Sequence, residues 1–156
     1  MYSTSLDDIN NCYRRDYRIT VLTKSIVISK SNIEKLIQHA KTEAPNESCA
    51  LLIGNEIQDE WIVKEIFLTE NVEKSKISFT ISPEQELEID KIARAKNMEI
   101  ICVFHSHPNS EAVPSSTDKE FMTTNSFPWM IYSVELDTIK TYLLESTLNE
   151  INIQEI

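Results

Sequence analysis

Two short apolar runs, Cys49–Ile53 and Glu99–Phe104, constrain the fold of this chain more than any other feature. Each run has the length of a strand, and the first is apolar enough to be buried on both faces. Gly54 is the only glycine in the sequence and follows the first run directly, so we expect it to end that strand in a turn. The runs predict the buried centre of a β-sheet.

Segments with helical periodicity lie between the apolar runs. Ser31–Thr42 repeats apolar residues at the spacing of one helix face, and Ser31 or Asn32 can cap its start. Pro83 opens a second helix that continues to about Lys96. Further strands are predicted at Ile19–Ile28 (an edge strand or hairpin), Trp61–Thr69, Ile77–Ile81, Trp129–Glu135, Ile139–Leu144 and Leu148–Ile156. The pattern predicts an α/β domain with a mixed β-sheet flanked by helices.

The length of 156 residues predicts one domain that needs neither a metal nor a disulfide to fold. Residues 1–18 are polar, so we interpret them as a tail and not a signal peptide, and residues 19–156 as the domain. No apolar run approaches the roughly 20 residues that span a bilayer. The three cysteines include no Cys-x-x-Cys pair, which favours the reducing cytoplasm. The net charge of −10 argues against binding to nucleic acid or anionic membranes.

Two of the three histidines, His105 and His107, stand two residues apart directly after the second apolar run. On an extended backbone they point to the same side, so both imidazoles can bind one metal ion. Asp118 lies in Thr117–Glu120, which matches a capping box and predicts the start of a short helix. Two imidazoles and one carboxylate leave one position for water, as in catalytic zinc sites, so we predict one Zn²⁺ per chain. The third histidine, His39, is expected at the surface.

A metal-dependent hydrolase also needs a group that moves a proton from the water to the leaving amine. Glu47 stands at the entry to the first apolar run, where partial burial would raise its pKa and suit this role. Ser115 precedes the expected helix, and its hydroxyl could donate a hydrogen bond to the oxyanion of a tetrahedral intermediate. Taken alone, Glu47 could equally be a solvated carboxylate and Ser115 a helix cap. Cys49 and Cys102 are interpreted as core residues, with a Cys–His nucleophile as the alternative.

The segment from His105 to Asp118 resembles the signature of the JAMM (MPN+) metallopeptidases: His-x-His, seven residues, Ser, two residues, Asp. The stretch Glu47–Gly54 is similar to the glutamate-bearing strand of the same family. The resemblance extends from about Ser25 to Leu144. It implies the JAB/MPN fold, an α/β architecture related to cytidine deaminases, although the His-x-Glu and Pro-Cys-x-x-Cys motifs of the deaminases are absent.

Carried over to this sequence, the resemblance implies zinc ligands at His105, His107 and Asp118. It also implies that Glu47 transfers the proton and that Ser115 stabilises the intermediate. Members of the family cleave peptide or isopeptide bonds after the C-terminal tail of ubiquitin or ubiquitin-like proteins. The compact size resembles the prokaryotic branch, which includes the archaeal desampylases. The expected partners are a ubiquitin-like or sulfur-carrier protein and its conjugates.

Some features of the chain depart from the family pattern. Ala50 stands where the family usually has glycine. The short link from Asp118 to Trp129 leaves little room for the insertion with which eukaryotic members grip ubiquitin.

A substrate tail would pair with a sheet edge, for which Lys76–Ile81 is the candidate. A peptidase that processes a sulfur-carrier protein and a non-catalytic MPN scaffold subunit are the alternative functions.

Overall fold

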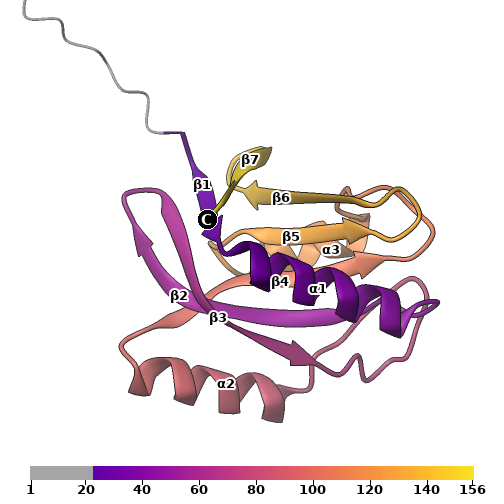
Figure 1. Ribbon diagram of the computed structural model, residues 1–156, viewed down its shortest axis with the longest axis horizontal. Coiled ribbons are helices and arrows are strands. Elements are labelled where there is room, and N and C mark those ends of the chain that lie inside the picture. Colours follow the sequence, from indigo (N-terminus) through magenta and orange to yellow (C-terminus); the bar gives the residue numbers. More distant parts are fainter. Residues whose placement is uncertain (1–22) are drawn as a thin grey trace, which may run out of the picture.

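The computed structural model describes residues 23–156, so the tail predicted at residues 1–18 lies outside the described part of the chain. Figure 1 shows the arrangement of the elements. Their order is β1 (Ser25–Ile28), α1 (Lys30–Glu43), β2 (Cys49–Ile57), β3 (Glu60–Thr69), α2 (Pro83–Ala95), β4 (Glu99–His107), α3 (Ser116–Met122), β5 (Trp129–Ser133), β6 (Thr138–Leu144) and β7 (Leu148–Glu155). Within residues 23–156, no helix combines the length and the apolar character needed to cross a membrane.

The seven strands found within residues 23–156 form one mixed sheet in the order β1-β3-β2-β4-β5-β6-β7. β4 lies at the centre of this order, antiparallel to β2 and parallel to β5. β1 pairs in parallel with both β3 and β7 and so closes the sheet into a barrel. The predicted mixed sheet with flanking helices is confirmed. For Ser25–Ile28, the prediction of an edge strand is wrong, because β1 is buried and pairs with β3 on one side and with β7 on the other. Residues 19–22 of the predicted segment lie outside the described part of the chain.

The sheet separates two apolar layers, and helices cover both. One layer joins Leu36 and Ala40 of α1 to Phe104 and other residues of the strands. The second layer joins Ile89 of α2 to Val103 and its neighbours on the opposite face. In Figure 1, α1 crosses in front of the strands and α3 lies behind β5. Because β4 is covered on both faces, it is apolar at consecutive positions and not only at alternate ones.

Gly54 lies within a strand and does not end it. β2 continues to Ile57, and its pairing with β3 shifts register at Gly54. A Cβ atom at Gly54 would stand 1.9 Å from the carbonyl oxygen of Ile62. Glycine is required there because the backbone of β3 approaches closely at an irregularity of the ladder. The turn between β2 and β3 is made instead by Gln58 and Asp59, which adopt φ values of 52° and 65°.

The strand predicted at Ile77–Ile81 is also wrong, since this segment belongs to an irregular loop between β3 and α2. The loop folds around the side chain of Asn71. That amide donates to the carbonyl of Ser78 at 3.0 Å and accepts from the N–H of Thr80 at 3.1 Å. The N–H of Val72 donates to the carbonyl of Thr80 at 3.0 Å. The side-chain amide thus satisfies backbone groups that a neighbouring strand would otherwise pair.

The remaining elements lie close to their predicted positions, with shifted ends. Ser29 caps α1 by accepting a hydrogen bond from the N–H of Asn32 at 3.2 Å, so the predicted caps at Ser31 or Asn32 are wrong. β5 ends at Ser133, two residues before its predicted end, and the turn to β6 includes Asp137 with a φ of 49°.

Candidate metal centre

β4 supplies two of the side chains predicted to bind a metal. The strand extends through His107, so His105 and His107 are both within regular β-structure and point to the same face. That face is the one on which Val103 contributes to the layer beneath α2. The side chain of His105 is fully buried, and His107 is 5% exposed. The backbone of a central strand therefore fixes the spacing between the two imidazoles.

α3 supplies the third side chain at its first turn. The hydroxyl oxygen of Ser115 accepts a hydrogen bond from the N–H of Asp118 at 3.0 Å. The N–H of Ser115 donates in return to Oδ2 of Asp118 at 2.8 Å. This capping box involves Ser115 and Asp118, so the box predicted over Thr117–Glu120 is wrong by two residues. The reciprocal bonds hold the Asp118 carboxylate in a fixed direction.

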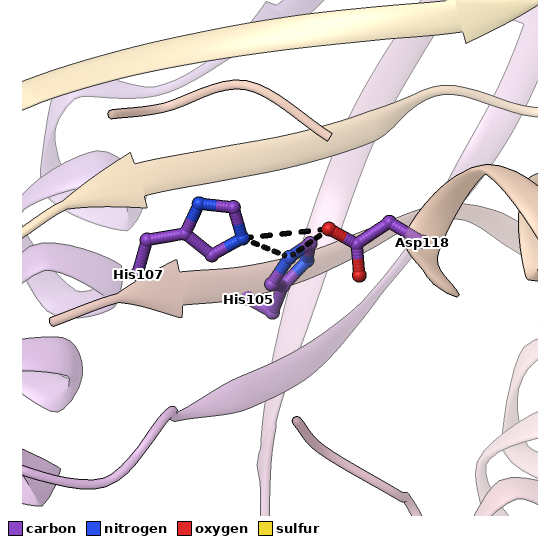
Figure 2. A group of neighbouring side chains, drawn as sticks. All are labelled: His105, His107 and Asp118. Atoms are coloured by element: carbon purple, nitrogen blue, oxygen red, sulfur yellow. Dashed lines mark hydrogen bonds and ion pairs between the residues drawn. The ribbon is translucent and has the colours of Figure 1, made fainter. Parts of the chain in front are cut away.

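The three side chains converge on one point, as Figure 2 shows. Nε2 of His105 lies 3.1 Å from Nε2 of His107 and 3.2 Å from Oδ2 of Asp118. Nε2 of His107 lies 3.4 Å from the same carboxylate oxygen. Metal–ligand distances of about 2.0–2.1 Å in a tetrahedron imply ligand separations of about 3.3 Å. The donor set therefore fits one tetrahedral divalent metal ion, with one coordination position left open.

The two imidazoles are held by different contacts. Nδ1 of His107 donates to the backbone carbonyl of Glu111 at 2.7 Å, which leaves the Nε2 lone pair directed at the centre. Nδ1 of His105 makes no hydrogen bond to any residue within the described part of the chain. The ring of His105 stacks instead on Phe79 and meets the edge of Trp129.

The protonation states of Asp118 and His105 suit metal binding. Burial raises the pKa of Asp118, but hydrogen bonds with His105 and His107 outweigh it and hold this pKa far below its usual range. Burial lowers the pKa of His105, against the opposing effect of Asp118. The carboxylate is therefore ionised and the buried imidazole neutral at neutral pH, and these are the forms that bind metal ions.

Glu47 lies beside this centre because the pairing of β2 with β4 continues toward it. The N–H of Ser48 donates to the hydroxyl of Ser106 at 2.8 Å. The N–H of Ser106 donates in return to the carbonyl of Ser48 at 3.0 Å. Continuing this antiparallel register by one residue places Glu47 opposite His107, on the face that carries the imidazoles. Glu47 is 5% exposed and is not a solvated loop carboxylate.

The electrostatic surroundings of Glu47 suit proton transfer. Burial raises its pKa to about 7, His107 opposes the shift, and Asp118 and Glu73 add to it. A carboxyl group with a pKa near the working pH can both accept and release a proton efficiently. The arrangement thus combines a metal-binding donor set with an adjoining acid–base group.

The described cysteines do not take part in this chemistry. Cys49 and Cys102 are buried in the core as predicted, and Cys12 lies outside the described residues. Burial raises the pKa of the Cys49 thiol to about 11 and raises that of Cys102 as well. Both groups are thiols at neutral pH, which argues against a Cys–His nucleophile. His39 is half-buried, and its Nε2 lies 3.1 Å from the carbonyl oxygen of Cys49.

Three features of the site are not predicted from the sequence: the Ser48–Ser106 pair, the loop around Asn71 and the stacked ring of Phe79. Only the first had a visible signal, because Ser106 is a polar residue inside an otherwise buried strand. A hydroxyl at that position needs a partner, and a neighbouring strand is where such a partner lies.

An apolar cavity of about 210 Å³ is lined by neighbours of His105 and by none of His105, His107, Asp118 or Glu47 themselves. Phe79 and Trp129 line it, and the rings of both residues also contact His105. Phe121 of α3 and Leu51 of β2 contribute to its walls.

Known proteins resemble this chain in sequence and in fold. A family model described as prokaryotic homologs of the JAB domain matches residues 29–145. A CysO-cysteine peptidase of Mycobacterium tuberculosis is 26% identical over 108 residues, which cover 69% of this chain and 73% of that protein. A desampylase of Pyrococcus furiosus is 28% identical over 109 residues, which cover 69% and 74%.

Two solved structures resemble the fold. A protein from Desulfitobacterium hafniense, determined in solution, superposes with a TM-score of 0.76 and 28% identity, covering 84% of this chain and 92% of that one. A JAB1/MPN domain protein from Archaeoglobus fulgidus gives a TM-score of 0.56 at 19% identity, covering 86% and 99%. The JAB/MPN fold and the resemblance to JAMM peptidases are thereby confirmed. The chain belongs to the prokaryotic homologs of the JAB domain and is a peptidase of the JAMM type.

Proposed function

We propose that this chain is a zinc-dependent peptidase that hydrolyses the bond after the C-terminal tail of a ubiquitin-like or sulfur-carrier protein. One observation carries the proposal: Nε2 of His105, Nε2 of His107 and Oδ2 of Asp118 converge at tetrahedral ligand spacing. These three residues would hold the ion. Two nitrogen ligands and one oxygen ligand with an open position are typical of catalytic zinc.

Zinc bound there would act as a Lewis acid toward the scissile carbonyl and the attacking water. Glu47 accepts the proton of that water and then delivers it to the leaving amine, for which its pKa near 7 is suited. Ser115 uses its hydroxyl oxygen to accept the N–H of Asp118, so the hydroxyl proton is available to the oxyanion of the intermediate.

The surroundings of the site support a peptide tail as substrate. The cavity of about 210 Å³ lies below the roughly 300–1,000 Å³ of pockets that take whole small molecules. It therefore suits one apolar side chain of an extended peptide. The names of the relatives, CysO-cysteine peptidase and desampylase, support a protein modifier or carrier as the substrate class.

The cytoplasm is the proposed compartment. Among the described residues, Cys49 and Cys102 are free thiols. Unpaired thiols in a well-packed core are usual for proteins of a reducing compartment.

The test combines metal analysis with a cleavage assay. Wild type, His107→Ala and Glu47→Gln are purified identically, and zinc is measured by elemental analysis. Each is then incubated with ubiquitin-like and sulfur-carrier proteins of the same genome, fused at the C-terminus to a reporter peptide. We expect about one zinc per wild-type chain and its loss in His107→Ala. We expect Glu47→Gln to keep zinc and to lose about 10²–10⁴-fold in cleavage rate.

Three results would contradict the proposal. If the wild-type protein contained no zinc after zinc had been supplied and the excess washed away, the metal-dependent mechanism would be ruled out. If the Glu47→Gln variant cleaved as fast as wild type, the role of Glu47 in proton transfer would be ruled out. Zinc retention without cleavage of any fusion would favour the scaffold alternative, against which the complete donor set argues.

A further inference from the structure

Within residues 23–156, no side chain or backbone group makes with His105 the contact that usually orients a metal-binding imidazole. A histidine ligand generally donates its second ring N–H to a carboxylate, carbonyl or water, which fixes the tautomer and the plane of the ring. His107 follows this rule through the carbonyl of Glu111. Nδ1 of His105 is buried and makes no hydrogen bond to any part of residues 23–156. Among the described residues, only contacts with the faces and edges of the His105 ring are therefore left to set the direction of its Nε2.

Phe79 provides such a contact. The rings of Phe79 and His105 stack with centroids 4.6 Å apart and an interplanar angle of 23°. Trp129 meets the His105 ring nearly at a right angle, with centroids 5.8 Å apart and an angle of 81°. A stacked face and a perpendicular edge together restrict rotation of the imidazole about its Cβ–Cγ bond.

The position of Phe79 is itself fixed, although the residue lies in an irregular loop. The side-chain amide of Asn71 hydrogen-bonds the carbonyl of Ser78 and the N–H of Thr80, which flank Phe79 on either side. The same amide donates to the carbonyl of Glu47 at 3.1 Å. Asn71 is 6% exposed, so these bonds are shielded from water. The loop therefore has one preferred geometry next to the metal site.

We propose that Phe79 is a positioning residue for His105, its stacked ring setting the orientation that a hydrogen bond sets for His107. The proposal rests on the metal site of the proposed function and concerns metal affinity. A side chain that only fills space at position 79 would leave the imidazole free to turn. Turning would move Nε2 away from the point on which His107 and Asp118 converge.

The experiment measures zinc binding to metal-free protein by competition with a chromophoric chelator, with the melting temperature of each metal-free variant as a check on folding. Phe79→Leu removes the aromatic ring, and Phe79→Tyr keeps it. Ile81→Ala is the matched control, because Ile81 lies in the same loop and lines the same cavity. Phe79→Met takes the place of Phe79→Leu if the leucine variant is unfolded at the assay temperature.

We expect Phe79→Leu to weaken zinc binding by about 10–100-fold, the usual effect of losing an outer contact of a ligand. Phe79→Tyr and Ile81→Ala should stay within about threefold of wild type. Equal affinity of Phe79→Leu and wild type, or equal losses in Phe79→Leu and Ile81→Ala, would overturn the proposal and leave the proposed function intact. A wild type that binds no zinc would overturn both.

Discussion

At the scale of single residues, Ser115 has one task that the structure shows and a second that we propose. It caps α3 with its oxygen, and we assign its proton to the oxyanion of the intermediate. Capping uses the hydroxyl oxygen as an acceptor, and the proposed catalytic task uses the hydroxyl proton as a donor. The two can therefore be separated by substitution. A carboxylate at this position can accept the N–H of Asp118 but has no proton to donate at neutral pH.

Ser115→Ala should lose both tasks, and Ser115→Asp only the second. We expect Ser115→Ala to lower the free energy of unfolding by about 1 kcal/mol in urea titrations. We expect Ser115→Asp to stay within about 0.5 kcal/mol of wild type. Both variants should lower kcat by about 10²–10³-fold. Ser115→Thr, which keeps the hydroxyl, is the control. Full activity of Ser115→Asp would show that the residue is only a cap.

The side chains of the centre differ in how far the sequence predicts them. His105 and His107 are predictable because the period of a strand places them on one face, and Asp118 because a helix start follows at short range. Glu47 is predictable as a charge beside an apolar run. Phe79 is not, since its contact with His105 depends on the fold of a loop far from His105 in sequence.

At the scale of elements, the loop between β3 and α2 is organised by one side chain. Asn71 bonds the carbonyls of Glu47 and Ser78 and accepts from the N–H groups of Glu73 and Thr80. It therefore replaces the pairing that a strand would give. The composition of Ile77–Ile81 resembles a strand, and nothing local in the sequence shows that an amide side chain satisfies the backbone instead.

Asn71→Ala should remove the hydrogen bonds that hold this loop in its conformation. Because it leaves shielded carbonyl and N–H groups without partners, we expect a loss of about 2–4 kcal/mol in the free energy of unfolding. Asn71→Asp keeps the acceptor but turns a carboxylate oxygen toward the buried carbonyls of Glu47 and Ser78, so its loss should be at least as large. Hydrogen exchange should show faster exchange at the N–H groups of Glu73 and Thr80. A change below about 0.5 kcal/mol in Asn71→Ala would mean that the loop holds its shape without this residue.

Helices and central strands are more predictable than this loop. The apolar runs that become β2 and β4 are covered on both faces, and each helix buries one stripe, so local patterns agree with their final environment. Gly54 shows the limit of such reasoning. Glycine after an apolar run signals either a turn or a close approach of another backbone, and only the position of Ile62 decides between them.

At the scale of the whole molecule, closure of the barrel is the feature least visible in the sequence. β1 and β7, near opposite ends of the described chain, pair in parallel from Ser25 to Ile28. Such a contact joins segments far apart in sequence, and no local pattern specifies it. The barrel and its helices enclose two apolar layers, so we expect the fold not to depend on the metal.

Zinc should therefore stabilise a fold that already exists. Protein stripped with a chelator should keep its circular dichroism spectrum and a cooperative melting transition. At free zinc of about 100 times Kd, binding adds about 2.7 kcal/mol, which raises Tm by about 5–10 °C for a chain of this size. The shift should be absent in His107→Ala and present in Glu47→Gln, because only the first removes a proposed ligand. If the stripped protein instead lost its cooperative transition, the metal would be part of the fold, and the two apolar layers would be insufficient to hold the barrel closed.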